Sequence, residues 1–276
     1  DTCRRQRQMC IRDSFNTSRE SLVPLLALNN KSNKNIIIFP TDKEAIEFST
    51  DFSNLNKNIF HLPSWDTLSY DSFVPSFDIQ GKRLEIAHLL LTNNNYNIAT
   101  SIKAISQRIY FEELEICKIE LNEEIDFDSL IENLIHLKYQ RKDRVESKGS
   151  FAIRGGQLDV YPINYDLPLR VIFDGDLVNE IKTFDTISQR SVSEKKDILI
   201  VPATELFQIK HSDILNLSSN KEENLDDYEL FQYSQNLDLE KCLLDLTSNV
   251  SLHIVDKNIV DNQLKEIIDI EKDTFE

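Results

Sequence analysis

The chain has 276 residues, 40% hydrophobic and 28% charged, which is enough to bury cores in two small domains and part of a third. Its formal net charge of -16 and its pI near 4.8 argue against non-specific wrapping of nucleic acid, because neutralising phosphates requires Lys and Arg clustered over a whole face. No run reaches the roughly 18 apolar residues of a membrane helix, and no apolar segment follows the basic start. We therefore expect a cytoplasmic protein without membrane contacts.

Residues 1–14 differ from the rest of the chain. Arg4 to Ser14 match, codon for codon, one reading frame of a common transposon-based sequencing adapter, and they contain the only methionine, Met9. We expect this segment to be non-native and leave it out of the fold prediction. The natural part, from Phe15 onward, is then expected to be an internal fragment. The alternative is a basic N-terminal arm for nucleic acid.

Alternating strand and helix patterns define an expected first domain, residues 15–108. Its predicted elements are a strand at 36–39, a helix from 41 to about 52, a strand at 58–62, a helix at 79–91 and a strand at 96–100. The first helix opens with Thr41-x-x-Glu44, a capping box. Strand and helix repeats of this length indicate an α/β fold with a parallel sheet covered by helices.

Residues 109–193 show a different pattern, which predicts a compact α+β domain inserted in the first or appended to it. Asp126 is a good N-cap for a helix with apolar residues at 3.6 spacing. Strands at 150–154 and 157–161 flank Gly155-Gly156, which predicts a type I′ hairpin turn with positive φ at both glycines. Strands at 169–173 and 177–184 form a second predicted hairpin around Gly175.

The remainder of the chain is divided by composition. We expect residues 194–211 to hold a strand, 198–201, that returns to the first sheet. The polar segment 212–227 is predicted to be a linker. A strand at 250–255 and a helix at about 260–270 are interpreted as the start of a further, truncated α/β domain, residues 228–276.

The residue types needed for catalysis or cofactor binding are not suitably spaced. The five glycines fall in neither GxxxxGK[ST] nor GxGxxG spacing, so we expect no phosphate loop and no nucleotide cofactor. The five histidines, with Cys117 and Cys242, lack zinc-ligand spacing. Adjacent carboxylates such as Glu112-Glu113 are interpreted as solvated surface. We therefore predict no catalytic residue, no metal site and no enzyme activity for this fragment.

A basic island stands out against the acidic background. Between 138 and 154, six basic residues outnumber Asp143 and Glu146. The basic residues are Lys138, Arg141, Lys142, Arg144, Lys148 and Arg154. Such a patch can orient a partner and raise its association rate.

Three stretches carry a resemblance to a known family: LPSWDTLSYDSF (62–73), GSFAIRGGQLDVYP (149–162) and FDTISQRS (184–191). In this order they resemble segments of the bacterial transcription-repair coupling factors, the Mfd family. The middle stretch is also similar to the damage-recognition protein UvrB. UvrB carries a long aromatic hairpin after the first stretch, and this chain has no room for one between Phe73 and the next helix. The sequence therefore favours the coupling factors.

The resemblance implies a RecA-like domain without motor function and an inserted UvrB-interaction-type domain that docks on UvrA. ATP would be a cofactor only of the parent's motor domains. RNA polymerase and DNA would be contacted only through domains further downstream. The phosphate-loop position of the family would fall near or before Phe15, and in coupling factors that loop has decayed.

The resemblance also implies UvrA-binding residues. Arg141 and Arg154 align with the two outer arginines through which UvrB-type domains contact UvrA, and Ala152 stands where UvrB has a third. Tyr161 matches an aromatic or apolar family position beside that surface. Arginine suits such a contact because its planar group makes two aligned hydrogen bonds to a carboxylate. Structural alternatives remain: Arg154 paired with a local acid, Arg141 simply solvated, and Tyr161 in the core.

The sequence thus predicts a UvrA-recruiting protein-interaction module that acts in transcription-coupled nucleotide excision repair. We expect its UvrA surface to be masked by another domain of the parent until the motor engages polymerase. The main alternative is a fragment of a UvrB-type excision-repair ATPase, which verifies damage. A direct DNA-binding domain is a third alternative and predicts affinity that falls steeply with salt.

Overall fold

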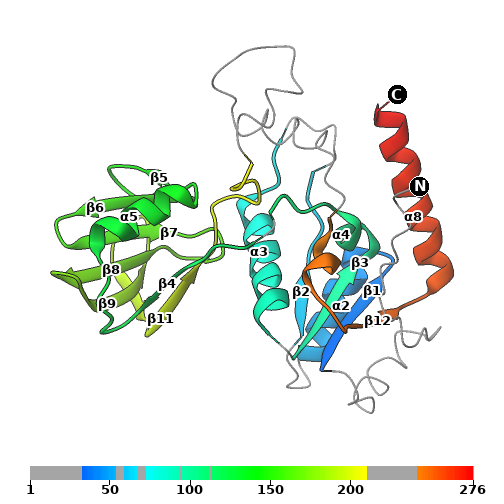
Figure 1. Cartoon of the computed structure of the whole chain (residues 1–276), viewed down its shortest axis with the longest axis horizontal. Coiled ribbons are helices and arrows are strands. Elements are labelled where there is room, and N and C mark those ends of the chain that lie inside the picture. Colours follow the sequence, from blue (N-terminus) through cyan, green and yellow to red (C-terminus); the bar gives the residue numbers. More distant parts are fainter. Residues whose placement is uncertain are drawn as a thin grey trace. The chain divides into compact units, whose positions relative to one another are not determined.

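The computed structural model describes residues 33–53, 59–67, 73–93, 95–111, 113–209 and 241–275, with side chains up to 270 (Figure 1). The adapter-like segment 1–14 and the predicted linker 212–227 lie outside these residues. The chain divides into two compact units. The first unit comprises residues 1–71, 86–109 and 238–276, and the second comprises 72–85 and 110–237.

The first unit contains a four-stranded sheet in which all pairs are parallel, with the order β12-β1-β3-β2. The strands are β1 (Lys34–Phe39), β2 (Phe60–Leu62), β3 (Tyr96–Ser101) and β12 (Ser251–Ile254). The helices connected to them are α2 (Asp42–Ser53), α3 (Phe77–Thr92), α4 (Ile102–Ser106) and α8 (Lys257–Phe275), with a 3₁₀ turn at Leu243–Leu246. The mixed α/β character and the parallel sheet are as predicted.

Helix α2 is fixed at its start and along one face. The capping box is present: Thr41 N–H donates to Glu44 Oε2, and Glu44 N–H donates to Thr41 Oγ1, both at 3.3 Å. Along the helix, Phe48 packs its ring against those of Phe39 and Phe52 with centroid distances of 5.1 and 5.5 Å. The local sequence and the sheet core therefore favour the same helix.

Two strand assignments made from sequence are wrong. Strand β11 (Asp197–Ile200) does not return to the first sheet; it pairs antiparallel with β4 (Cys117–Glu120). Only two residues separate it from the preceding strand, so it stays in the second unit. Strand β12 does not begin a further domain either, because it joins the first sheet beside β1. The alternation of apolar residues predicts which side chains of a strand are buried, but it does not predict which strand pairs with it.

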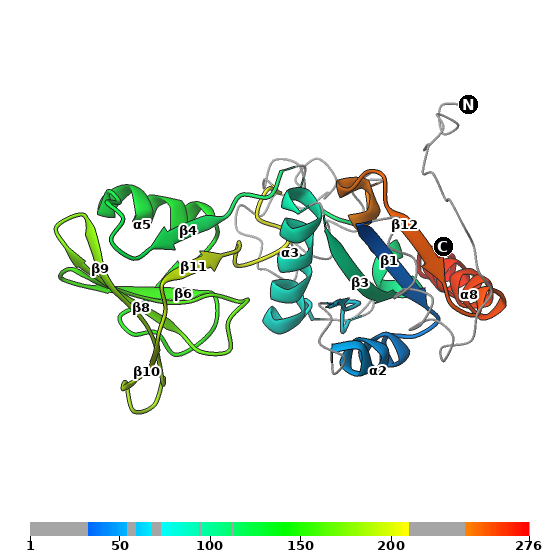
Figure 2. The same ribbon diagram turned by 90° about the horizontal axis from the view of Figure 1, so that it is seen from below.

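The second unit is built on a six-stranded sheet with the order β10-β9-β8-β7-β6-β5. All its pairs are antiparallel except β5 and β6, which are parallel. Its strands are β5 (Gln140–Arg141), β6 (Ser150–Arg154), β7 (Gln157–Tyr161), β8 (Leu169–Asp174), β9 (Leu177–Phe184) and β10 (Ser191–Glu194). Helix α5 (Phe127–His136) lies over one face, and the connection from β9 to β10 lies on the other side (Figure 2).

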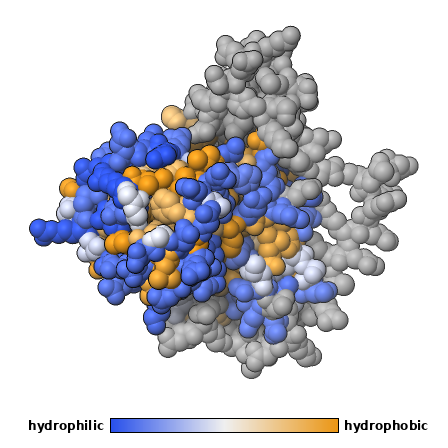
Figure 3. Space-filling model, turned by 60° about the vertical axis from the view of Figure 1, so that its left-hand side comes forward, coloured by the Kyte–Doolittle hydropathy of each residue, from blue (hydrophilic) through white to orange (hydrophobic). Residues whose placement is uncertain are grey.

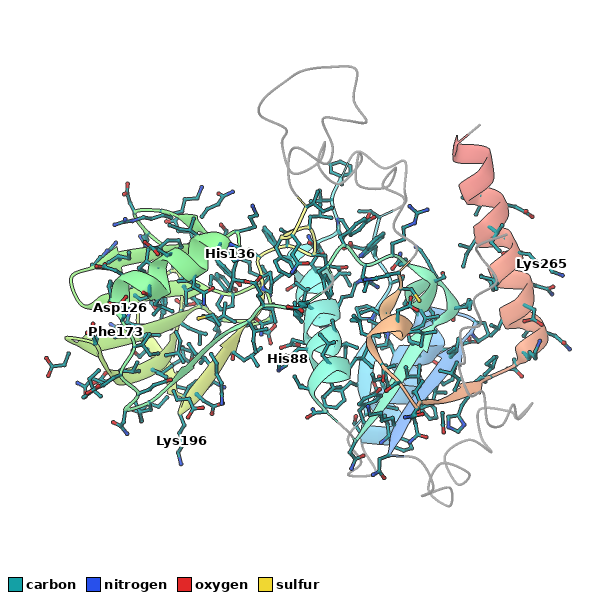
Figure 4. All side chains as sticks on the ribbon, viewed as in Figure 1. His88, Asp126, His136, Phe173, Lys196 and Lys265 are labelled. Atoms are coloured by element: carbon teal, nitrogen blue, oxygen red, sulfur yellow. The ribbon has the colours of Figure 1, made fainter. Side chains whose placement is uncertain are left out.

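The core of the second unit lies under α5. Leu130 and Leu134 of the helix join Phe151, Val160 and Val171 of the sheet in one buried cluster. The helix begins at Asp126, whose Oδ2 accepts a hydrogen bond from Ser129 N–H at 2.8 Å. Figure 4 labels Asp126 at the start of α5 and His136 at its end. The predicted helix, its N-cap and both hairpins are confirmed.

The turn between β6 and β7 differs from the type I′ prediction. Only Gly155 has a positive φ, 60°, and Gly156 does not, as in a type II′ turn. Gly156 is instead required by a close approach: a Cβ there would lie 2.8 Å from the carbonyl oxygen of Phe173. The Phe173 N–H donates to Gly156 O at 2.7 Å. The second glycine thus lets the backbone of β8 come close.

The first half of α3, Phe77–Glu85, belongs to the second unit. Gln80 Oε1 accepts hydrogen bonds from Thr204 Oγ1 at 3.0 Å and from Glu205 N–H at 2.9 Å. Gly81 lies so close to Ile163 that a Cβ would be 2.5 Å from its carbonyl oxygen. The Gln80 hydrogen bonds therefore hold this half-helix against the segment that follows β11. The absence of a Cβ at Gly81 lets it lie close to the segment that follows β7.

In the coloured part of the face shown in Figure 3, hydrophobic patches lie between hydrophilic side chains. Among the helices described, none is both long and apolar enough to cross a membrane.

Candidate functional site

The six-stranded sheet of the second unit has two chemically different faces. Side chains alternate along each strand, so the residues paired with Phe151 and Val160 face α5. The opposite face, here called the outer face, carries Ala152, Asp159 and Arg170, which are cross-strand neighbours. Of these three, Ala152 belongs to the basic island, residues 138–154, found in the sequence.

A loop crosses the outer face. Because β5 runs parallel to β6, the chain has to travel back between them, and residues Lys142–Gly149, here called the crossover loop, make this return. Val145 anchors the loop: it is 2% exposed and packs with Ala152, Phe184 and Tyr161. The most basic segment of the chain is therefore held against the sheet.

Arg154 lies at the end of β6 on the outer face and is exposed. Its Nη2 donates to the main-chain oxygen of Asp143 at 3.3 Å, so Arg154 binds a carbonyl of the crossover loop. Arg141 is exposed on the edge strand β5. It is in register with Phe151, which places it on the α5 side. The two arginines thus approach the same edge of the sheet from opposite faces.

Tyr161 lies at the end of β7 and is half-buried. Its hydroxyl donates to Asp166 O at 2.7 Å, and Lys148 Nζ lies 5.9 Å from the centre of its ring. Burial, with the nearby carboxylates of Asp78 and Asp166, raises the pKa of the hydroxyl. The ring therefore supports the crossover loop while one part of it remains accessible.

Ala152 occupies the position at which the resemblance places a third arginine in UvrB. In this chain it is 3% exposed and lies under Val145. The small side chain lets the crossover loop lie close to the sheet, so the contact surface at this position is formed by the loop.

The connection from β9 to β10, residues Asp185–Arg190, is here called the β9–β10 loop. Asp185 Oδ1 accepts from Ser188 N–H at 2.7 Å and from Ser188 Oγ at 2.8 Å, and these bonds lower the pKa of Asp185. Gln189 Nε2 donates to Thr186 O at 2.8 Å. The loop also forms a backbone turn in which Gln189 N–H donates to Asp185 O at 2.8 Å. It is therefore fixed by its own polar groups.

Two arginines from the rest of the unit bind the β9–β10 loop. Arg144, in the crossover loop, donates from Nη2 to Thr186 O at 2.9 Å. Arg170 donates to Gln189 O at 3.4 Å and to its Oε1 at 3.3 Å. Arg170 is itself held by Asp159, in two hydrogen bonds of 2.7 and 2.8 Å, and its guanidinium lies 4.4 Å from the ring centre of Phe184.

Sequence reasoning found the exposed arginines but missed the residues that organise them. Val145 is one apolar residue within a charged run, which is a signal for an anchored loop that could have been recognised. The Asp159 and Arg170 pair depends on strand register, and the sequence alone does not reveal that register.

A cavity of about 980 Å³ lies in the second unit beside the start of β6. Lys138, Lys142 and Lys148 line it together with Phe77, Leu206 and Phe207. Lys148 Nζ is already bound to Asp78 Oδ1 at 2.5 Å and to Ile163 O at 3.0 Å.

The residue types that ligate metals do not cluster in the described ranges. Within them no group of three or more His, Cys, Asp or Glu side chains could hold a metal ion. At the carboxyl edge of the parallel sheet, where α/β proteins bind ligands, Asp42 accepts hydrogen bonds from Ser101 Oγ at 2.8 Å and from the Ser64 N–H at 3.3 Å. These residues stabilise the sheet edge through one another.

Comparison with known families finds a match within the second unit. Residues 117–206 match the model of the UvrB interaction domain. Residues 117–206 are therefore similar to the UvrB interaction domain, and this stretch includes Arg141, Arg154, Tyr161 and both loops of the outer face.

The relatives extend this likeness beyond the domain. The chain is 29% identical over 174 residues to the transcription-repair-coupling factor of Escherichia coli K12, covering 62% of this chain and 15% of that protein. It is 31% identical over 159 residues to that of Myxococcus xanthus, covering 56% and 13%. UvrABC system protein B of Thermosipho africanus is 24% identical over 190 residues, covering 62% and 28%. The chain is thus similar to the coupling factors and to UvrB over only a small part of their length.

Proposed function

We propose that this chain is the UvrA-recruiting module of a transcription-repair coupling factor and acts in transcription-coupled nucleotide excision repair. The observation that carries the proposal is the exposure of Arg141 and Arg154 at the β5 edge of a UvrB interaction domain. The partner is UvrA, and it contacts the β5 edge on both faces of the sheet. Tyr161 contributes the apolar support beside it.

The chemistry of this surface suits an acidic partner site. The basic residues of the crossover loop, with Arg141 and Arg154, form a positive region in a chain with a net charge of -16. Such a region orients an incoming acidic surface and raises the association rate. Arginine adds geometric selectivity, because it can donate two parallel hydrogen bonds to one carboxylate.

The rest of the chain serves this binding role in our proposal. The first unit is a RecA-like domain without a phosphate loop, and the fragment has no catalytic activity and binds no cofactor. ATP, RNA polymerase and DNA belong to other parts of the parent protein, which acts in the cytoplasm. The likeness to UvrABC system protein B favours one alternative, a fragment of a UvrB-type ATPase. A phosphate loop distinguishes them, because only the alternative requires a complete one.

The test is binding of the full chain to purified UvrA at moderate salt, with Arg141→Glu and Arg154→Glu as variants. Each reversal is expected to weaken binding by about thirtyfold, or roughly 2 kcal/mol. Lys265→Glu is the matched control: Lys265 is an exposed cation on α8 of the first unit (Figure 4), and its reversal should leave binding unchanged. Absence of binding by the folded wild-type chain would overturn the proposal.

A further inference from the structure

The β9–β10 loop presents an isoleucine that the fold does not use. The side chain of Ile187 is 88% exposed, while its neighbours in the loop are engaged in hydrogen bonds. Asp185, Ser188 and Gln189 close the turn, and Arg144 and Arg170 hold its carbonyls and the Gln189 amide. The loop conformation is therefore fixed without any contribution from the Ile187 side chain.

This loop is continuous with the arginine surface. Arg154 donates to the main-chain oxygen of Asp143. Arg144, which follows Asp143 in the crossover loop, donates from Nη2 to Thr186 O at 2.9 Å and to Ile187 O at 3.5 Å. Contacts therefore run from Arg154 through the crossover loop to Ile187 itself. Both loops lie on the outer face, away from α5.

Two exposed arginines belong to the loops around Ile187, with the carboxylates of Glu146 and Asp185 beside them. Arg144 remains 43% exposed even though it binds the loop, with Glu146 3.8 Å from its Nε. Arg190, at the end of the same loop, is exposed as well. An exposed apolar side chain whose loops present Arg144 and Arg190 fits an apolar socket with carboxylates on its rim.

We infer that Ile187 is an apolar anchor of the UvrA contact and inserts into an apolar, carboxylate-rimmed socket on UvrA. This inference rests on the proposed function and deepens it, because it extends the contact from the β5 edge across the outer face. Interfaces typically concentrate their binding energy in a few apolar or arginine anchors surrounded by polar groups. A β-branched side chain on an ordered loop also loses little conformational freedom when it is buried.

The experiment compares binding of UvrA by the full chain and by three variants. Ile187→Ala is expected to weaken binding about tenfold or more, and Ile187→Leu, which keeps the volume, should retain most of the affinity. Ile135→Ala is the matched control, because Ile135 is also exposed, at 54%, and lies on α5 of the same unit. Its affinity should stay within about twofold of wild type. Amide exchange at Ser188 and Gln189 should be the same in Ile187→Ala and wild type, since the loop is held by other groups.

The outcomes separate this inference from the function it rests on. If Ile187→Ala binds UvrA as wild type does while Arg154→Glu loses affinity, the anchor role is wrong and the proposed function stands. Equal losses for Ile187→Ala and Ile135→Ala would also overturn the anchor role. If the folded wild-type chain does not bind UvrA, both proposals fail.

Discussion

Arg83 Nε donates to Glu205 Oε1 at 2.9 Å, and the two side chains are only 1% and 5% exposed. They are 122 residues apart in the chain, so this ion pair ties the first half of α3 to the segment that follows β11. A charged pair this deeply buried is stable only while both partners are present, because an ion left alone in the interior bears the full desolvation cost.

We therefore expect Arg83→Met to destabilise the second unit by about 3–5 kcal/mol, because it leaves the Glu205 carboxylate buried without this cation. Urea unfolding followed by circular dichroism measures the change. The double variant Arg83→Met/Glu205→Leu should recover most of the loss. A loss in the single variant below about 1 kcal/mol would show that Glu205 does not depend on Arg83.

Gly81→Ala should also destabilise the unit, although alanine favours a helix interior by about 1 kcal/mol over glycine. The new Cβ would lie 2.5 Å from the carbonyl oxygen of Ile163, a backbone atom that cannot move without shifting the loop. We expect a net loss of about 1–3 kcal/mol in urea unfolding. Lys82→Ala, at the next and exposed position of α3, is the control and should be neutral. A stabilised Gly81→Ala variant would contradict the close approach.

Asp126 predicts a specific pH dependence. Hydrogen bonds from the Ser129 side chain and N–H lower its pKa from the ordinary 3.8. The pKa of Asp126 is thus lower in the folded state than in the unfolded state. The Asp126 cap therefore stabilises the fold fully at pH values above the unfolded pKa, and this stabilisation is lost as the pH falls through the folded pKa. Asp126→Asn can still accept the bond but does not titrate, so its urea midpoint should fall less than that of wild type below about pH 4. Parallel pH profiles would argue against this cap.

Ala152→Arg tests the packing of the crossover loop. The position is 3% exposed and lies under Val145, so a long side chain has to displace the loop. We expect faster amide exchange in Lys142–Gly149 and a loss of about 1–3 kcal/mol. Asn179→Arg, at an exposed position of β9, should change neither. Unchanged exchange in the Ala152 variant would mean that the loop is not anchored there.

Local features of the sequence predicted their structures well. Thr41 and Glu44 form the expected capping box, and Asp126 caps α5, because these bonds join residues only three apart. Tertiary relationships were not predictable in the same way. The parallel strand β5 has only two residues, and the need for Gly156 arises from β8, whose register the sequence does not state. Arg141 and Arg154 were recognised as exposed cations, but their positions on opposite faces follow from that same register.

The half-helix Phe77–Glu85 also has a consequence for the order in which the molecule assembles. A ribosome adds about 5–20 residues per second, so the 122 residues between Arg83 and Glu205 take roughly 6–24 s to synthesise. Throughout this interval Arg83 has been made but its buried partner has not. The second unit can therefore close only after nearly all of it has left the ribosome, even though its first helical turns are among the earlier parts of the chain to appear.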